Sequence, residues 1–110
     1  MLFAGKACIV TGATSGIGRA IALELASQRA DLLLIGRNES RGLEVLAQLR
    51  SLGAAASFMA ADVAQPESAR AVVDSALGIY GRIDVLVNNA GVLINGRDGH
   101  ADVGSCFSRR

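Results

Sequence analysis

TGATSGIG, residues 11–18, is the most informative segment of this sequence, because it stands between a short apolar run and a segment with helical spacing. Its three glycines are spaced Gly-x-x-x-Gly-x-Gly, and each suits a different task. We expect Gly12 to allow a sharp turn off a strand, Gly16 to let a diphosphate approach the backbone, and Gly18 to let the helix pack closely on the sheet. Free amide hydrogens and the helix dipole would then face the phosphates. The segment therefore predicts a binding site for dinucleotide phosphates.

Two other kinds of site use a similar glycine-rich segment. A tight turn that binds nothing also uses glycine, and it stays open as the alternative. The phosphate loop of nucleoside triphosphatases needs Lys and then Ser or Thr directly after the last glycine of a Gly-x4-Gly segment. Neither register that starts at Gly12 supplies that pair, so this class is excluded.

Outward from the turn, apolar runs alternate with segments of helical periodicity. We expect strands at residues 6–11, 31–35, 55–61 and 83–87, and helices at residues 16–28, 39–52 and 66–80. The helical faces are expected to carry Ile17, Ile21 and Leu25 in the first helix and Leu43, Leu46 and Leu49 in the second. This alternation predicts an α/β fold with a parallel sheet of Rossmann type.

The handedness of the crossovers fixes the expected strand order. Right-handed connections put the first two helices on one face if the first three strands run outward in sequence. A fourth strand on the other side of strand one then sends its helix to the opposite face. The expected order is 3-2-1-4, a truncated doubly wound sheet. Ligands of such sheets bind at the carboxyl ends of the strands, where the order reverses, which here means beside Gly12 and Asn88.

Arg37, after the second strand, bears on the choice of dinucleotide. The residue about twenty positions after the glycine turn commonly contacts the adenosine ribose, as an acid for a free 2′-hydroxyl or an arginine for a 2′-phosphate. The chain has Gly36-Arg37-Asn38 there and no acid before Glu39. A guanidinium can bind phosphate through two hydrogen bonds, so NADP is preferred over NAD. Alternatively, Arg37 is a solvated residue that opens the next helix.

Polar residues also follow the third and fourth strands. Asp62-Val63 comes after the third strand, and Asp62 could accept a hydrogen bond from an adenine amino group or merely order its own loop. Asn88-Asn89-Ala90-Gly91 follows the fourth, where amides lie beside the reversal point and small residues leave room for a ribose.

In combination, TGATSGIG, Asp62-Val63 and Asn88-Asn89-Ala90-Gly91 resemble the classical short-chain dehydrogenase/reductase family from about Lys6 to Gly91. The resemblance implies NAD(P)-dependent oxidoreduction of alcohols and carbonyls. It implies that Asp62 and Val63 flank adenine, and that residues 88–91 stabilise the central sheet and line the cofactor. The expected cofactor-binding residues are Gly12, Thr14, Ser15, Gly16, Ile17, Gly18, Arg37, Asp62, Val63, Asn88, Asn89, Ala90 and Gly91.

The same resemblance bears on catalysis. The family uses a Tyr with a Lys four residues later, and an upstream Ser, beyond the Asn-Asn-Ala-Gly loop. Here the only tyrosine, Tyr80, is followed four residues later by Asp84, and the only lysine is Lys6. We expect both at the amino ends of the strands, with Tyr80 packing at a helix end. We therefore expect the amino-terminal half of such an enzyme, from an interrupted or alternative reading frame, with no catalytic residues and no turnover by itself.

Composition narrows the remaining classes. The net charge is +1 and the basic residues are spread out, so nucleic acid is not an expected partner. Cys8 and Cys106 lack metal-ligand spacing, so we expect reduced thiols, no metal and a cytoplasmic protein. Apolar runs are too short to span a membrane. We expect residues 1–94 to form the dinucleotide-binding half-domain and residues 95–110 to be an unpatterned tail, in a loop or disordered.

Two other functions remain open. The chain could be a non-catalytic interaction fragment whose exposed strand-four edge pairs with another chain or a second copy. It could also become active when a partner supplies a missing segment.

Overall fold

The computed structural model describes residues 2–89, in which strands and helices alternate as the sequence predicts. The elements in chain order are β1 (Ala7–Thr11), α1 (Gly16–Ser27), β2 (Asp31–Gly36), α2 (Glu39–Ser51), β3 (Ala55–Ala60), α3 (Pro66–Tyr80) and β4 (Val85–Asn88). Every predicted element is confirmed, and β4 begins two residues later than expected. The expected domain boundary at residue 94 and the expected tail at residues 95–110 lie outside the described residues.

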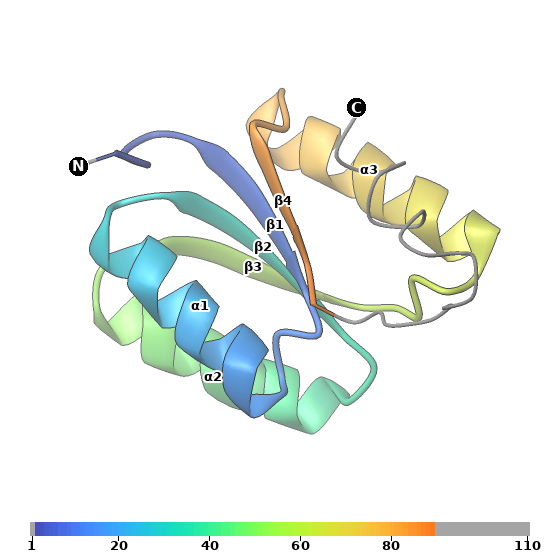
Figure 1. The fold of residues 1–110 in the computed structure, drawn as a ribbon, viewed down its shortest axis with the longest axis horizontal. Coiled ribbons are helices and arrows are strands. Elements are labelled where there is room, and N and C mark those ends of the chain that lie inside the picture. The colour runs from blue at the N-terminus through green and yellow to red at the C-terminus, as the bar shows by residue number, and fades with distance from the viewer. Residues whose placement is uncertain (1, 90–110) are drawn as a thin grey trace.

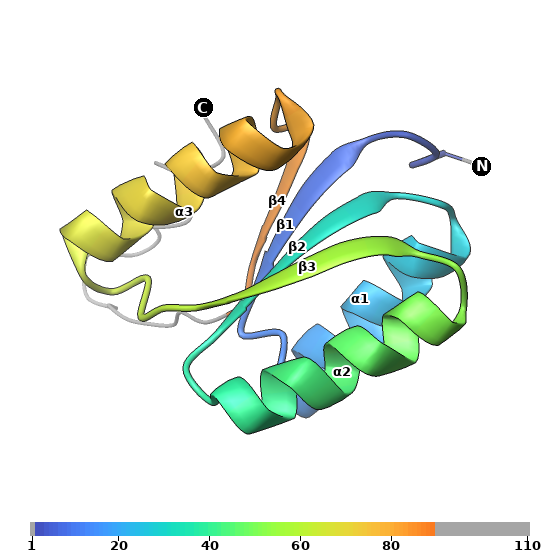
Figure 2. The same ribbon diagram turned by 180° about the vertical axis from the view of Figure 1, so that it is seen from behind.

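The sheet has the predicted strand order, β3-β2-β1-β4, with all pairs parallel. Figure 1 shows α1 and α2 on one face of the sheet and α3 on the other, and Figure 2 shows the same arrangement from behind. This placement is what right-handed crossovers require when the strand order reverses beside β1. The carboxyl ends of β1 and β4 therefore lie side by side, with Thr11 opposite Asn88.

Alternate residues of the two central strands build two apolar cores. Cys8 and Val10 of β1, with Leu32 and Leu34 of β2, face α1 and α2. The residues between them, such as Leu33, face α3. All of these side chains are buried, as expected for a parallel sheet that is covered on both faces. At about 1.5–3 kcal/mol for each buried aliphatic side chain, the two cores are the main source of stability.

Short-range interactions fix where the helices begin and end. The Asn38 side chain caps α2 by accepting a hydrogen bond from the Arg41 amide at 3.0 Å. Gly53 follows α2 with a φ of +86°, so the predicted stop after that helix is confirmed. Pro66 occupies the start of α3 as expected, and Gly81 ends it in the left-handed conformation.

The predicted apolar faces of α1 and α2 are wrong at their first residues. Ile17 is 68% exposed and Leu43 is 50% exposed. Each helix is rotated so that a glycine near its start faces inward, Gly18 in α1 and Gly42 in α2. At Gly42 an added Cβ would lie 2.2 Å from the ring of Phe58, so any other residue would force that ring to move.

Within residues 2–89, no helix is both long and apolar enough to cross a membrane. The same residues contain no group of three or more His, Cys, Asp or Glu side chains that could hold a metal ion.

Candidate functional site

The turn between β1 and α1 reverses the chain at the carboxyl edge of the sheet. Gly12 has a φ of +63°, in the region that glycine adopts at no steric cost, as its predicted role requires. The Ala13 amide donates to the Ile35 carbonyl of β2 at 3.0 Å, which anchors the turn to the neighbouring strand. The Ser15 amide donates back to the Gly12 carbonyl at 3.2 Å, which closes the turn. The glycine segment is therefore a fixed bend at the tip of a central strand.

Ser15 caps the helix that follows the turn. Its hydroxyl donates to the Gly12 carbonyl at 2.8 Å and accepts from the Gly18 amide at 3.2 Å. The first bond of the helical ladder runs from the Arg19 amide to the Ser15 carbonyl at 2.8 Å. The amides of Gly16 and Ile17 precede that bond, so the helix supplies no acceptor for them. This end of α1 thus presents two amide hydrogens and the positive end of the helix dipole to solvent.

Gly18 and Gly16 have opposite surroundings. A Cβ at Gly18 would lie 2.0 Å from the Gly12 carbonyl oxygen, so α1 packs directly against the turn only because that side chain is absent. The sequence predicted that Gly18 lets the helix pack closely on the sheet. In the structure the close contact of Gly18 is with the turn at Gly12. Apart from its chain neighbours and its own helix backbone, a Cβ at Gly16 would meet no atom of residues 2–89 within 4 Å. The structure therefore leaves open space in front of the Gly16 backbone.

Thr11, Asn88 and Asn89 tie the end of β4 to the glycine turn. The buried Thr11 hydroxyl lies 3.1 Å from the Asn88 side-chain oxygen and 3.3 Å from the Val87 carbonyl, and it accepts from the Asn89 amide at 2.9 Å. The Asn89 side chain donates to the Gly12 carbonyl at 3.3 Å and to the Ser15 hydroxyl at 3.0 Å. The two asparagines thus join the end of β4 to β1 and to the glycine turn at the site.

Arg37 and Asp62 lie at the carboxyl ends of β2 and β3. The Arg37 guanidinium and the Asp62 carboxylate approach to 4.0 Å, with side chains that are 79% and 41% exposed. The other Asp62 oxygen accepts from the Ala64 amide at 3.0 Å, so this residue does order its own loop. Val63 packs against the core on the α3 face.

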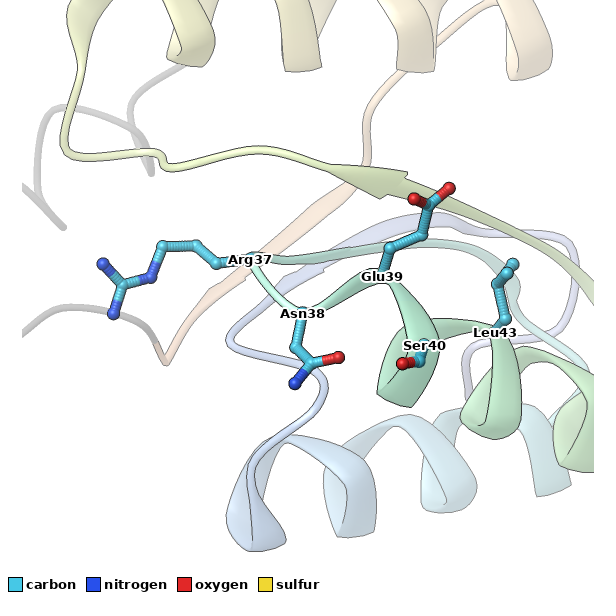
Figure 3. Close-up of a pocket in the computed structure, with 5 residues that line it drawn as sticks. All are labelled: Arg37, Asn38, Glu39, Ser40 and Leu43. Atoms are coloured by element: carbon cyan, nitrogen blue, oxygen red, sulfur yellow. The ribbon is translucent and has the colours of Figure 1, made fainter.

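An open depression of about 980 Å³ lies beside Arg37 at the start of α2 (Figure 3). Its lining is mixed in polarity and consists of Arg37, Asn38, Glu39, Ser40 and Leu43. In Figure 3 the side chains of Arg37 and Glu39 leave the start of α2 in different directions.

Tyr80 does not belong to this site. Its hydroxyl donates to the Leu32 carbonyl, near the amino end of β2, at 2.5 Å. Burial raises the pKa of Tyr80, whereas an acid–base tyrosine needs its pKa lowered toward neutrality. The predicted packing role of Tyr80 at the end of α3 is confirmed.

The structure brings most of the predicted site residues to one edge of the sheet. Exposed Ile17 lies at the start of α1, beside the open space at Gly16. Thr14 packs over Gly36, where an added Cβ would lie 2.8 Å from the Thr14 methyl carbon. Ala90 and Gly91 lie outside the described residues.

Sequence reasoning assigned no role to Thr11 or Gly36. Thr11 is the polar residue that ends an otherwise apolar strand, and this position was the sequence signal for a buried hydrogen-bonding role. The need for glycine at position 36 depends on the position of Thr14, which no local pattern indicates.

The fold and this edge define a Rossmann-type domain with a glycine turn at the reversal of strand order. A family model, short chain dehydrogenase, matches residues 6–106 and so continues past Gly91, where the resemblance was expected to end. The chain belongs to this family.

The comparisons with individual proteins agree. The chain is 43% identical over 91 residues to a 3beta-hydroxysteroid dehydrogenase of Mediterraneibacter gnavus, covering 83% of this chain and 33% of that protein. A short-chain oxidoreductase from a metagenome, solved in complex with NADP, matches with a TM-score of 0.78 and 37% identity over 84% of this chain and 42% of that one. A Burkholderia phymatum member in complex with NAD has a TM-score of 0.75 and 34% identity over 78% of this chain and 31% of that one.

The chain spans about a quarter to a third of the length of the curated relatives it matches.

Proposed function

We propose that the turn between β1 and α1 binds the diphosphate of a nicotinamide dinucleotide, and that the chain is the cofactor-binding part of an oxidoreductase. The observation that carries the proposal is the contrast between two glycines. At Gly18 the missing side chain serves the fold, whereas at Gly16 no side chain of residues 2–89 occupies the space. A ligand that approaches the backbone gives a reason for a bare position at the end of a helix. The dinucleotides bound to two similar structures support this interpretation.

The residues present fit such a group. The Gly16 and Ile17 amides would bind the diphosphate, and Thr14 and Ser15 would border it. Asn88 and Asn89 would hold the floor of the site rigid through their bonds to Thr11 and the turn. Ala90 and Gly91 would line the site beyond β4. When bound, a nicotinamide dinucleotide supplies hydride transfer, and the described residues bind and orient it.

We infer that NADP(H) is preferred over NAD(H). Arg37 is the cation at the end of β2, its guanidinium is largely exposed, and an open depression lies beside it. An arginine at this position can bind a 2′-phosphate through two hydrogen bonds. Asp62 and Val63 would border the adenine from the end of β3.

At the level of the whole protein, we propose oxidoreduction of an alcohol or carbonyl substrate, in the cytoplasm. The described residues contribute binding to this reaction. Their one tyrosine is engaged with Leu32 far from the glycine turn, so we propose that the acid–base step is not theirs. Incubation of the chain with NADPH and simple aldehydes should give no oxidation of NADPH, followed by absorbance, and steady oxidation would overturn this part.

Calorimetric titration of the 110-residue chain with NADPH and with NADH tests the proposal. We expect saturable binding of both, tighter for NADPH. Gly16→Val should abolish binding without unfolding the chain, because its side chain fills the proposed ligand space, which residues 2–89 leave open. Arg37→Gln should weaken NADPH binding and leave NADH binding nearly unchanged. A folded wild-type chain that binds neither at millimolar concentration contradicts the proposal.

A second function, association through the edge of β4, has an observation of its own. Among the described residues β4 pairs only with β1, and an apolar depression of about 280 Å³ opens between α3 and these two strands. An unpaired edge beside apolar surface favours pairing with another chain. Light scattering across a dilution series should then show a dimer whose fraction falls on dilution, and a monomer at every concentration would exclude self-association.

A further inference from the structure

Asp62 lies where it can oppose the preference that Arg37 confers, and the β2–β3 ladder is the reason. Gly36, the last residue of β2, pairs with Ala60, the last residue of β3. The ladder continues by one bond, because the Ala61 amide donates to the Gly36 carbonyl at 3.0 Å. Arg37 follows Gly36 directly, and Asp62 follows Ala61. The two residues therefore leave the sheet at the same edge.

The two oxygens of Asp62 have separate tasks. One is held by the Ala64 amide at 3.0 Å, and the Gln65 amide binds the Asp62 carbonyl at 3.0 Å, so the loop fixes the carboxylate in position. The second oxygen is the one that lies 4.0 Å from the Arg37 guanidinium. A carboxylate held by its own loop thus faces a largely exposed cation.

A phosphate that binds Arg37 must compete with this carboxylate. It must separate the pair or share the guanidinium with Asp62, and its own negative charge is repelled by the acid at short range. NAD, with a 2′-hydroxyl in place of the phosphate, meets neither penalty. We propose that Asp62 is a specificity-determining residue that acts through Arg37 and lowers the preference of this site for a 2′-phosphorylated dinucleotide. The inference rests on the proposed function of the site.

The quantity that isolates this role is the ratio of the dissociation constants for NADH and NADPH. Adenine is common to both dinucleotides, so any contact of Asp62 with adenine cancels in the ratio. A purely structural effect of Asp62 on its loop also weakens both ligands together. Only an interaction that senses the 2′-phosphate, directly or through Arg37, changes the ratio.

Asp62→Asn is the matched substitution, because Asn keeps an oxygen that can accept from the Ala64 amide while it removes the charge. We expect the Kd of NADPH to fall about two- to fivefold relative to that of NADH, the range for an exposed ion pair. Asp74→Asn, the same change on the exposed surface of α3, serves as the control for net charge and should leave the ratio unchanged. If Asp62→Asn does not fold, Asp62→Ser, whose hydroxyl can also accept from the Ala64 amide, takes its place.

A double-mutant cycle completes the test. In an Arg37→Gln background, Asp62→Asn should shift the ratio by less than it does in the wild-type chain, because the cation that links the two groups is gone. Equal shifts in both backgrounds, or no shift in either while both dinucleotides bind, would overturn the inference and leave the proposed function standing. A wild-type chain that binds neither dinucleotide overturns both.

Discussion

Gly16 and Gly18 are two residues apart in one turn, yet the structure gives them different reasons to be glycine. The space at Gly16 is open, and the space at Gly18 is occupied by the Gly12 carbonyl. Both glycines belong to one motif, and only the three-dimensional structure separates the residue that serves the fold from the residue that serves the proposed ligand.

Gly18→Ala should therefore destabilise the fold, in contrast to the binding defect expected of Gly16→Val. The new Cβ would lie 2.0 Å from a backbone oxygen, so α1 must move away from the turn. We expect a loss of about 1–3 kcal/mol in the free energy of unfolding, the usual range for overpacking. Urea denaturation followed by circular dichroism measures it. An unchanged midpoint for Gly18→Ala would mean that the helix and the turn are not in contact.

At the scale of elements, a clamp joins the segment before β4 to the start of β1. The Asp84 carboxylate accepts from the Ala7 amide at 2.8 Å and from the Arg82 guanidinium at 2.7 Å, and Arg82 also donates to the Gly5 carbonyl. The Ala7 hydrogen bond, followed by Arg82, lowers the pKa of Asp84 below its usual 3.8. The contribution of Asp84 to the clamp is therefore largest while its carboxylate is ionised.

The sign of the pH dependence follows from this lowered pKa. The contribution of Asp84 to stability should be fully present well above pH 3.8, and it should be lost as the pH falls below that value toward the folded-state pKa. Urea midpoints measured from neutral pH to pH 3 should fall more steeply for the wild-type chain than for Asp84→Asn. Parallel curves for the two proteins would show that the carboxylate does not couple to folding.

Elements were the easiest feature to predict from the sequence, because strand and helix signals are local. The Gly53 and Pro66 boundaries and the β3-β2-β1-β4 order follow from backbone preferences and crossover handedness. The faces of the helices were harder to predict. A three- or four-residue spacing defines an apolar stripe but not its rotation about the helix axis, so Ile17 and Leu43 were placed on the apolar faces of their helices and are exposed.

The site was predictable to the extent that it depends on backbone. The glycine turn, the Ser15 cap and the start of α1 all lie within the segment TGATSGIG. The hydrogen bonds of Thr11 to Asn88 and Asn89, in contrast, join residues that are 77 and 78 positions apart. The approach of Arg37 to Asp62 likewise depends on the register of β2 against β3. Interactions of this kind are set by tertiary structure, which no local pattern contains.

At the scale of the whole molecule, we expect the thiol of Cys8 to become reactive only on global unfolding. It is completely buried in β1, and burial, followed by the charges of Asp84 and Asp31, raises the pKa of its thiol to about 11. In a Cys106→Ser variant, a thiol reagent should react with Cys8 only when the chain unfolds. NADPH at about 100 times its Kd should slow the reaction about a hundredfold, because it binds only the folded chain. Rapid labelling of a folded sample would show that β1 is not protected.

The central claim is that the diphosphate of a nicotinamide dinucleotide lies on the glycine turn at the reversal of strand order. Amide NMR spectra recorded during titration with NADPH test it most directly, since they report where the ligand binds as well as whether it binds. We predict that the largest shifts fall on the amides of Gly16 and Ile17, with further shifts at Arg37, and that the amino ends of the strands near Tyr80 are unaffected. Saturable binding that leaves residues 12–18 unshifted would contradict the account.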